Sequence, residues 1–530
     1  MRGLGRLYLN LTTEDTPLDS AIMGSYVIIG LGILLAGWIA YDLLQRRHAI
    51  LRNFPIIGHF RYWLEAVGPE LRQYIVTSSD EERPFSRDQR SWIYASSKRE
   101  NNYFGFGTDN DLENSPAYLI IKQSAFPLRE PSGGEPGHDP HHRIPCAKML
   151  GGPRGRARAF RPESLINVSA MSFGSLSAKA VEAINRGVAL AGCMQNTGEG
   201  GISSHHRHGG DLVWQIGTGY FGCRDERGNF SIERFREQVA AHPKIRAIEI
   251  KLSQGAKPGH GGVLPGRKVT EEIAGIRGIP ADRDCLSPSG HSAFGDVDSM
   301  LDFVERLAED SGLPVGIKSA VGDLDFWRRL ATAMEPGGRG VDFITIDGGE
   351  GGTGAAPMVF SDHVALPFKV GMSRVFKEFA TRGLQHRVVF IGGGRLGFPQ
   401  QVLLAAALGC DMINIAREAM LAIGCVQAQR CHTDHCPTGV ATQNRWLMHG
   451  LDPMHKSARL ANYVTTLRKE VLALCRACGV PHPAFIGSDI LEFVDDRFGS
   501  VTVAERFGYQ AGWCLPAEAD REWLRQQSRG

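Results

Sequence analysis

The sequence predicts an α/β protein built on a (β/α)8 TIM barrel, with additions at both ends of the chain. Short apolar, β-rich runs that end in Gly, Ser or Lys alternate with longer helical patterns, which is typical of a parallel sheet. The 530 residues are enough for one large barrel plus further segments. The 64 glycines exceed the usual share of roughly 7%, as expected of a protein with many tight turns and close ligand approaches.

Composition narrows the class of protein further. Hydrophobic residues make up 42% of the chain and charged residues 22%, which is ordinary for a globular enzyme. The formal net charge of +2 provides no broad basic surface, so we expect no nucleic-acid partner. The eleven cysteines are an odd number in a large domain, so a metal cluster and free thiols are expected rather than a disulfide scaffold.

The first element is a transmembrane helix over residues 21–44, after a short N-terminal segment, residues 1–20. Ala21–Tyr41 carries no charge and would span about 31 Å as a helix, enough for the hydrocarbon core. The competing interpretation is a cleaved signal peptide, but the run exceeds a usual h-region and no A-x-A site follows. Charges on the two sides predict a single-pass protein of the inner (cytoplasmic) membrane with its catalytic body in the cytoplasm. Glu14, Asp15 and Asp19 precede the run, and Arg46, Arg47, His48 and Arg52 follow it.

Three further segments are predicted from composition and periodicity. Residues 45–150 form a cap and linker region without a clear period, residues 151–443 the barrel, and residues 444–530 a helical extension. Two further barrel strands are less certain and are placed near Met194–Thr197 and Cys285–Ser289. The clear strands are Leu165–Ser172, Ala247–Gln254, Val315–Val321, Phe343–Gly352, Arg387–Gly394 and Met412–Glu418, and helices are expected at Ser177–Gly192, Asp298–Asp310 and Pro399–Gly409.

A glycine-rich turn near the end of the barrel predicts a flavin phosphate site. Ile391–Gly397 (IGGGRLG) follows a strand and precedes a helix, where backbone N–H groups can bind an anion. The next strand end lies at Ile413–Glu418, and the loops after strands seven and eight form the phosphate site in many such barrels. The alternative is two glycine-rich turns without a ligand. The candidate residues are Gly392, Gly393, Gly394, Ala416 and Arg417.

Lysines at two strand ends and in one loop are candidates for binding anions. Lys251 and Lys318 lie in apolar strands, where burial is costly unless the ammonium meets an anion. A flavin N1/O2 edge or a substrate carboxylate would supply one; the alternative is a lysine that extends to solvent. Gln254 and Lys257 follow in a glycine-rich loop, so we expect carboxylate binding there.

Two glycine-rich loops each contain an acidic residue. Asn196–Gly201 (NTGEGG) holds Glu199, which would orient ammonia or polarise an imine. Asp347–Pro357 (DGGEGGTGAAP) holds Gly351 and Gly352, where backbone can approach a flat ligand closely. The alternative for the glycines is turn geometry alone, and for the acids a solvated loop charge.

The most specific motif is a group of three cysteines, Cys425, Cys431 and Cys436, spaced C-x5-C-x4-C and followed by a proline. Three clustered thiolates match an iron–sulfur cluster with one open or missing iron corner. The alternative is zinc, with His432 or His435 as fourth ligand. The pair Cys475 and Cys478 lies in an apolar helical stretch and is interpreted as buried thiols.

These residues together resemble the synthase (FMN-binding) portion of glutamate synthase, across more than half of the chain. The resemblance implies FMN on the barrel, a [3Fe-4S] cluster on the three cysteines, and 2-oxoglutarate near Gln254 and Lys257. It further implies that Ser169, Met171, Gln215 and Lys318 lie against the flavin. The motifs that carry it are SAMSFGSLS, NTGEGG, QIGTGYFG, IKLSQGAKPGHGGVLPGRKV, LSPSGH, DGGEGGTGAAP and the cysteine segment that ends in CPTGVATQ.

The activity implied by the resemblance is reductive amination of 2-oxoglutarate, through 2-iminoglutarate, to glutamate. The start of the chain, MRGLGRLYLN, lacks the N-terminal cysteine of a glutaminase, and no NAD(P)H-binding module is visible. We therefore expect ammonia or a separate glutaminase as nitrogen source, and ferredoxin or a reductase subunit as electron donor. His260 stands where the family usually has an acid, which bears on the substrate. The alternatives are an N-methylglutamate-type synthase or another FMN and iron–sulfur amino-acid oxidoreductase, and a non-catalytic membrane electron-transfer subunit.

Overall fold

The computed structural model describes residues 17–45, 47–76, 81–112, 115–135, 137–495 and 499–529. Most of the expected N-terminal segment, residues 1–16, lies outside them. Internal contacts divide the chain into a first unit that ends at Arg87 and a second that begins at Asp88.

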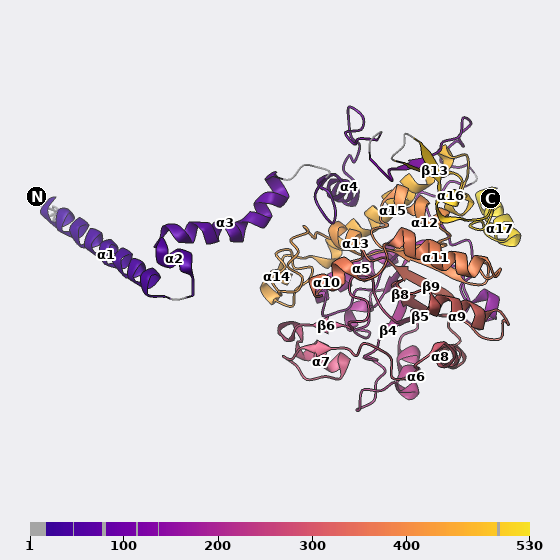
Figure 1. Cartoon of the computed structure of the whole chain (residues 1–530), viewed down its shortest axis with the longest axis horizontal. Helices are drawn as coiled ribbons and strands as arrows, with labels where there is room; N and C mark the ends of the chain where they lie inside the picture. Colours follow the sequence, from indigo (N-terminus) through magenta and orange to yellow (C-terminus); the bar gives the residue numbers. More distant parts are fainter. Residues whose placement is uncertain are drawn as a thin grey trace, which may run out of the picture. The chain divides into compact units, whose positions relative to one another are not determined.

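The second unit contains a closed barrel of parallel strands, as the sequence predicts. Neighbouring strands follow the order β10-β11-β2-β3-β4-β5-β8-β9, which is chain order once the ring is closed. Figure 1 shows strands in the interior of this unit with helices around them. The strands are β2 (Ile166–Val168), β3 (Met194–Asn196), β4 (Asp211–Ile216), β5 (Ile245–Lys251), β8 (Val315–Ser319), β9 (Phe343–Asp347), β10 (Val389–Gly393) and β11 (Met412–Ile415).

The helices around the barrel begin and end where the local sequence favours it. Ser177 caps α5 by accepting a hydrogen bond from Ala180 N, and Gly192 ends the helix in the left-handed conformation. Asp296 forms a capping box with Ser299 at the start of α8. The three predicted helices are confirmed as α5 (Ala178–Ala191), α8 (Val297–Ser311) and α12 (Pro399–Ala407). The others are α6 (Ile232–Ala241), α7 (Glu271–Arg277), α9 (Asp325–Met334), α10 (Met358–His363), α11 (Phe368–Ala380) and α13 (Arg417–Ala422).

One of the eight barrel strands was assigned wrongly from the sequence. The strand expected near Met194–Thr197 is confirmed as β3, but the one expected at Cys285–Ser289 is not in the barrel. Cys285–Leu286 forms β7, which pairs antiparallel with β6 (Val263–Leu264) in a separate two-stranded sheet. The missing barrel strand is β4, whose run DLVWQI begins and nearly ends with polar residues and so lacks a continuous apolar pattern.

The C-terminal region adds a long helix and a small sheet to the barrel. Helix α15 (Pro453–Ala477) packs on α5, and a Cβ at Gly187 would lie 2.9 Å from the Leu460 side chain, so this crossing requires glycine. Cys475 is buried on α15, as expected, whereas Cys478 at the cap of this helix is only partly buried because it lies at the end of the packed stretch. The region also holds strands that no local pattern predicted. The remaining elements are α4 (Arg87–Lys98), β1 (Leu119–Ile121), α14 (Arg445–His449), β12 (Leu491–Val494), β13 (Ser500–Thr502), α16 (Val503–Phe507) and α17 (Glu518–Arg529), with β1, β12 and β13 forming one sheet.

The first unit consists of helices α1 (Pro17–Leu44), α2 (Ala49–Asn53) and α3 (Ile57–Leu71), followed by a π-helical turn at Arg72–Val76. Within α1, the 21 residues Gly24–Leu44 have a mean hydropathy of 2.1 and are long and apolar enough to cross a membrane. The side chains of this stretch are almost entirely exposed in the unit itself.

Candidate active site

The candidate site lies at the carboxyl ends of the barrel strands, where strand register places two lysines side by side. Lys251 on β5 is the register partner of Lys318 on β8, and Lys318 in turn lies opposite Thr345 on β9. Both lysines are more than 90% buried, so neither extends to solvent. Two adjacent buried cations repel each other, and the site must therefore supply negative charge.

Each of the two lysines has its own carboxylate. Lys251 Nζ lies 2.7 Å from Glu199 Oε1 and 2.8 Å from Gln254 Oε1, which joins the loop after β3 to the loop after β5. Lys318 Nζ lies 3.3 Å from Asp347 Oδ2 at the end of β9. Burial would raise the pKa of Glu199, but the nearby Lys251 overcomes it and the pKa is lowered. Burial would likewise lower the pKa of Lys318, yet Asp347 raises it. Glu199 is therefore no solvated loop charge.

Lys257 differs from both strand-end lysines because no carboxylate of the described part of the chain pairs with it. Its Nζ donates a hydrogen bond to the carbonyl oxygen of Ala355, 2.9 Å away, and only 5% of the residue is exposed. Within the described residues no carboxylate lies at ion-pair distance from this ammonium group. Burial, helped by the charge of Lys251, lowers the pKa of Lys257 to about 8. The loop after β5 thus presents a cation whose direct counter-ion is missing.

The loops after β5 and β9 lie in close contact beside this cation. A Cβ at Gly255 would lie 1.7 Å from the carbonyl oxygen of Gly348, so only glycine fits there. The N–H of Gly255 donates to Asp347 Oδ2 at 3.0 Å. The ring of His260, in the same loop as Lys257, contacts Phe360 edge-on, and its buried Nδ1 has no hydrogen-bond partner among the described residues. The loops after β5 and β9 therefore pack directly on each other next to Lys257 and His260.

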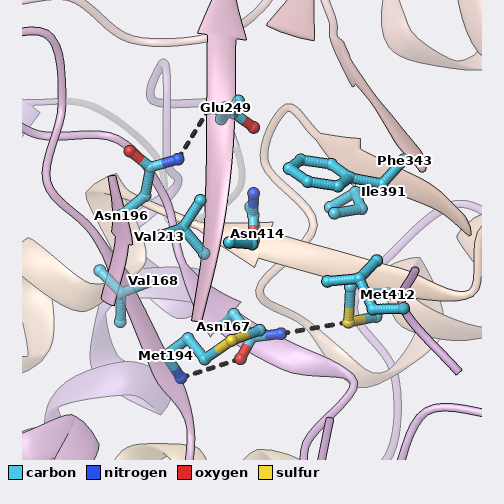
Figure 2. Close-up of a pocket in the computed structure, with 12 residues that line it drawn as sticks. Asn167, Val168, Met194, Asn196, Val213, Glu249, Phe343, Ile391, Met412 and Asn414 are labelled. Carbon is cyan, nitrogen blue, oxygen red and sulfur yellow. Dashed lines mark hydrogen bonds between the residues drawn. The ribbon is translucent and has the colours of Figure 1, made fainter. Parts of the chain in front are cut away.

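A buried glutamate supports the site from inside the barrel. Glu249 on β5 accepts hydrogen bonds from Asn196 Nδ2 at 2.7 Å, from Gln215 Nε2 at 2.6 Å and from Thr345 Oγ1 at 2.7 Å. Figure 2 shows Glu249 and Asn196 at one end of a cavity of about 20 Å³, room for roughly one water molecule. Glu249 thereby fixes the side chain of Gln215, one of the residues expected against the flavin.

The loops after β10 and β11 hold the residues expected at a phosphate. Strands β10 and β11 pair in register, so Gly392 and Gly393 lie beside the strand that ends before Ala416 and Arg417. Gly394 adopts a φ of +136°, which side chains rarely allow. Glycines from the loop after β9 lie against the same region. A Cβ at Gly351 would be 3.3 Å from Asp347 Oδ1, and one at Gly352 would be 2.8 Å from the Arg417 side chain. At the end of β10, a Cβ at Gly393 would be 3.2 Å from Asp347 Oδ1.

Part of this region is already occupied by a carboxylate of the chain itself. Glu418, which is buried, accepts hydrogen bonds from the backbone N–H of Gly397 at 3.1 Å and of Ala416 at 3.2 Å. The side chain of Arg417 donates to the carbonyl oxygen of Glu350. A phosphate here would therefore bind at the turn around Gly394 and at Arg417, rather than at the N–H groups that Glu418 holds.

The loop after β2 brings the remaining flavin candidates to the same end of the barrel. The N–H of Ser169 donates to Ile415 O at 2.8 Å, which places Ser169 next to the end of β11. A Cβ at Gly198 would lie 2.5 Å from Ser172 N and 2.9 Å from Met171 C. The loop that carries Glu199 thus packs directly on the loop that carries Ser169 and Met171.

The three-cysteine segment packs against this same loop after β2. Lys268, which is 1% exposed, donates to Ser175 O at 2.7 Å, to Ala441 O at 3.2 Å and to Cys431 O at 3.4 Å. The hydroxyl of Tyr94 donates to Cys425 O at 2.8 Å. Lys268 therefore connects the segment that holds the three cysteines with the loop after β2, which carries Ser169 and Met171.

The three thiols of this segment are buried or half-buried. Cys436 is 7% exposed, and burial together with the neighbouring thiols raises the pKa of Cys425 and of Cys431. Across the described ranges, no group of three or more His, Cys, Asp or Glu side chains is gathered closely enough for a single metal ion. Zinc with His432 or His435 and the iron–sulfur cluster both stay predictions from the sequence.

Several residues of the site were missed by sequence reasoning. Glu249, like Lys251, is a charged residue inside an apolar strand, so the sequence pattern could have indicated it as a site residue. Asp347 and Lys268 stand in quoted motifs, but their partners depend on register and long-range packing. In the motif LSPSGH, His291 Nδ1 lies 3.0 Å from the Tyr220 hydroxyl and Nε2 lies 3.0 Å from Lys251 O. His291 thus contacts the last residue of β5.

Together the fold and the site define an α/β-barrel enzyme with a charged site at the carboxyl ends of its strands. The model for a conserved region in glutamate synthase matches residues 155–481, and the chain belongs to the glutamate synthase family of oxidoreductases. Glutamate synthase large subunit-like protein YerD of Bacillus subtilis is 38% identical over 484 residues, covering 86% of this chain and 92% of that protein.

Other relatives match over a smaller part of their length. Archaeal glutamate synthase [NADPH] of Methanocaldococcus jannaschii is 35% identical over 318 residues, which is 59% of this chain and 59% of that protein. The chain thus spans about three fifths of the archaeal relative. Among solved structures, a flavocytochrome b2 variant with benzoylformate is similar at 13% identity and a TM-score of 0.43, covering 93% of this chain and 95% of that one.

Proposed function

We propose that this chain reduces and aminates 2-oxoglutarate, through 2-iminoglutarate, to give glutamate. The observation that carries the proposal is Lys257, a buried ammonium group for which the described residues offer no carboxylate partner, beside two lysines that each have one. A dicarboxylate substrate supplies the missing charge. Family membership, with relatives named glutamate synthases, supports the same reaction.

The overall reaction consumes 2-oxoglutarate, ammonia, two electrons and two protons, and it releases glutamate and water. Protonated Lys257 would pair with a substrate carboxylate, and Gln254, held by Lys251, would donate a hydrogen bond from its free amide nitrogen. Glu199, kept ionised by Lys251, would orient ammonia and accept a proton as the imine forms. The carbonyl carbon would then lie between the loops after β3 and β5.

The residues present fit the cofactors that the family implies. FMN would supply the hydride for the imine carbon, and a [3Fe-4S] cluster would relay single electrons to it from ferredoxin or a reductase subunit. Glycines of the loops after β9 and β10 pack closely on Asp347 and Arg417. The buried Lys318, Gln215 and Ser169, together with Met171, would line the flavin. Arg417 would face the phosphate, and Cys425, Cys431 and Cys436 would bind the cluster.

The test is anaerobic reoxidation of the reduced, cofactor-loaded protein by 2-oxoglutarate plus ammonium, followed by amino-acid analysis. We expect flavin reoxidation with one glutamate formed per two electrons, and neither event when ammonium is omitted. Full cofactor content without glutamate would contradict the proposed reaction. If 2-oxoglutarate also fails to bind in calorimetry, the chain would instead be a non-catalytic electron-transfer subunit.

The cluster can be tested separately from the reaction. Cys431→Ser should abolish the low-temperature electron paramagnetic resonance signal of an oxidised three-iron centre while FMN binding persists. Cys478→Ser is the matched control, since this thiol is the C-cap of α15, outside the three-cysteine segment, and should leave the signal unchanged. Iron content that is unaffected in Cys431→Ser would refute the assignment of the ligands.

We further propose that α1 spans the inner membrane once and that the second unit lies on the cytoplasmic side. The apolar stretch Gly24–Leu44 and the basic residues after it, Arg47 and Arg52, support this orientation. Membranes washed with alkaline carbonate should retain the full chain, and added protease should cleave the second unit only in inside-out vesicles. Release by carbonate would contradict a spanning helix.

A further inference from the structure

Helix α3 has one face of large apolar side chains that nothing in the described part of the first unit covers. Ile57, Phe60, Trp63, Leu64 and Leu71 are between 38% and 77% exposed. At 100° per residue these five positions fall within an arc of roughly 120°, which is the stripe of an amphipathic helix. Phe60 and Trp63 stack on each other, with ring centroids 5.7 Å apart.

The opposite face of α3 is polar. Arg61 and Glu65 form an i,i+4 ion pair at 2.9 Å, and both side chains are more than half exposed. The short exposed residue Ala66 also lies on this side. The helix therefore separates apolar and polar surface, as helices do that lie in the plane of a membrane interface.

Contacts to the end of α1 fix where this apolar face lies. Asp42, which is fully buried near the end of the apolar stretch, accepts a hydrogen bond from Ile56 N at 2.9 Å, and its Oδ1 lies 2.9 Å from His59 Nε2. The rings of Trp38 and His59 are 5.3 Å apart. The first turn of α3 is thus bound to the last turns of α1.

The connection between α2 and α3 is also specific. Ile56 adopts a φ of +64°, which is strained for a β-branched residue and is held by the hydrogen bond to Asp42. A Cβ at Gly58 would lie 3.0 Å from the Leu51 side chain, so α3 approaches α2 closely. These contacts set the direction in which α3 leaves the end of α1.

We propose that α3 lies in the cytoplasmic interface of the same bilayer that α1 crosses, with Ile57, Phe60, Trp63 and Leu64 among the lipid acyl chains. The inference rests on the proposed membrane anchor and deepens it. If α1 spans the bilayer, its last turns lie at the interface, and the contacts through Asp42 keep α3 at that depth. Tryptophan and phenylalanine favour this depth, and Arg47 and Arg52 would meet anionic headgroups.

The proposal is tested on the full chain in vesicles of phosphatidylcholine and phosphatidylglycerol. The Trp63 signal is taken as the fluorescence difference between wild type and Trp63→Phe. It should lose most of its intensity in lipids brominated high on the acyl chain, and less in lipids brominated near the chain end. Aqueous acrylamide should quench it weakly.

Matched variants separate an interfacial helix from other arrangements. Leu64→Glu, on the apolar face, should make Trp63 accessible to acrylamide and reduce its quenching by brominated lipid, whereas Ala66→Glu, on the polar face, should do neither. Trp63 that is protected from both quenchers would lie against protein, as in a second copy of the chain, and would overturn the proposal.

The anchor and the interfacial helix fail in different ways. Loss of the chain from carbonate-washed vesicles would contradict a membrane-spanning α1, on which the proposal for α3 rests. Retention of the chain together with acrylamide quenching of Trp63 in the wild type would leave α1 in the membrane and place α3 in water.

Discussion

Buried lysines lie in two regions, the ends of strands β5 and β8 and the loop after β5. The two regions neutralise the charge of these lysines differently. At the strand ends, Lys251 and Lys318 are register neighbours, and each has a carboxylate from another segment. In the loop, Lys257 is equally buried and only reaches a carbonyl oxygen. We infer that paired lysines stabilise the folded site, whereas the unpaired one is kept for a substrate anion. Variants that remove one partner at a time separate these two roles.

The largest effect is expected for Asp347→Ala at the strand ends. The change leaves Lys318 buried without its carboxylate and removes the acceptor for Gly255 N, so the free energy of unfolding should fall by about 3 to 5 kcal/mol. Asp347→Asn, which keeps that acceptor but not the charge, should lose less. Denaturant unfolding measures both, and a loss below about 1 kcal/mol for Asp347→Ala would remove the contrast between the two regions.

The loop should show the reverse behaviour. Lys257→Met removes an unpaired buried cation, so the free energy of unfolding should change by no more than about 1 kcal/mol. Binding of 2-oxoglutarate should weaken by roughly 10- to 100-fold, the value of one lost charge-assisted hydrogen bond. Calorimetric titration checks the affinity. Lys244→Met, at an exposed lysine, is the control and should alter neither quantity. Unchanged affinity in Lys257→Met would assign the substrate carboxylate to another residue.

The pH dependence of binding sharpens the assignment to Lys257. Its pKa is lowered to about 8 by burial, so the group is charged below pH 8 and becomes neutral above it. Since only the charged form pairs with a carboxylate, the dissociation constant for 2-oxoglutarate should be flat below pH 8 and rise by up to about tenfold per pH unit above it. In Lys257→Met this rise should disappear. A rise that persists in the variant would point to a different titrating group.

The sequence predicted most of the barrel because its strands are short apolar runs that end in residues with chemical functions. It failed at β4, where Asp211 and Gln215 interrupt the apolar pattern, and at Cys285–Leu286, which looks like a strand but pairs within a loop. The sheet of β1, β12 and β13 joins segments far apart in sequence, so no local pattern could show it.

For the candidate site, the sequence located charged residues but not their partners. Lys251, Lys318 and Glu199 were named from their positions, yet which acid meets which lysine follows from the register of β5, β8 and β9. The lack of a partner at Lys257, which carries the functional proposal, is visible only when every carboxylate around it has been placed.

A small effect on stability is expected at Glu249, which lies on β5 and accepts hydrogen bonds from Gln215 and Thr345. In Glu249→Gln the amide oxygen can still accept from Asn196 and Gln215, while Thr345 turns its hydroxyl to accept from the new NH2 group. The free energy of unfolding should therefore change by only about 1 kcal/mol.

The negative charge of Glu249 beside Lys318 is nevertheless lost in Glu249→Gln. If FMN lies against Gln215 and Lys318, its reduction potential should rise, because the site then favours the electron-rich form. Spectroelectrochemical titration measures the shift, and Thr345→Val, which removes one hydrogen bond but no charge, should leave the potential in place. Equal potentials in Glu249→Gln and the wild type would place the flavin away from these strand ends.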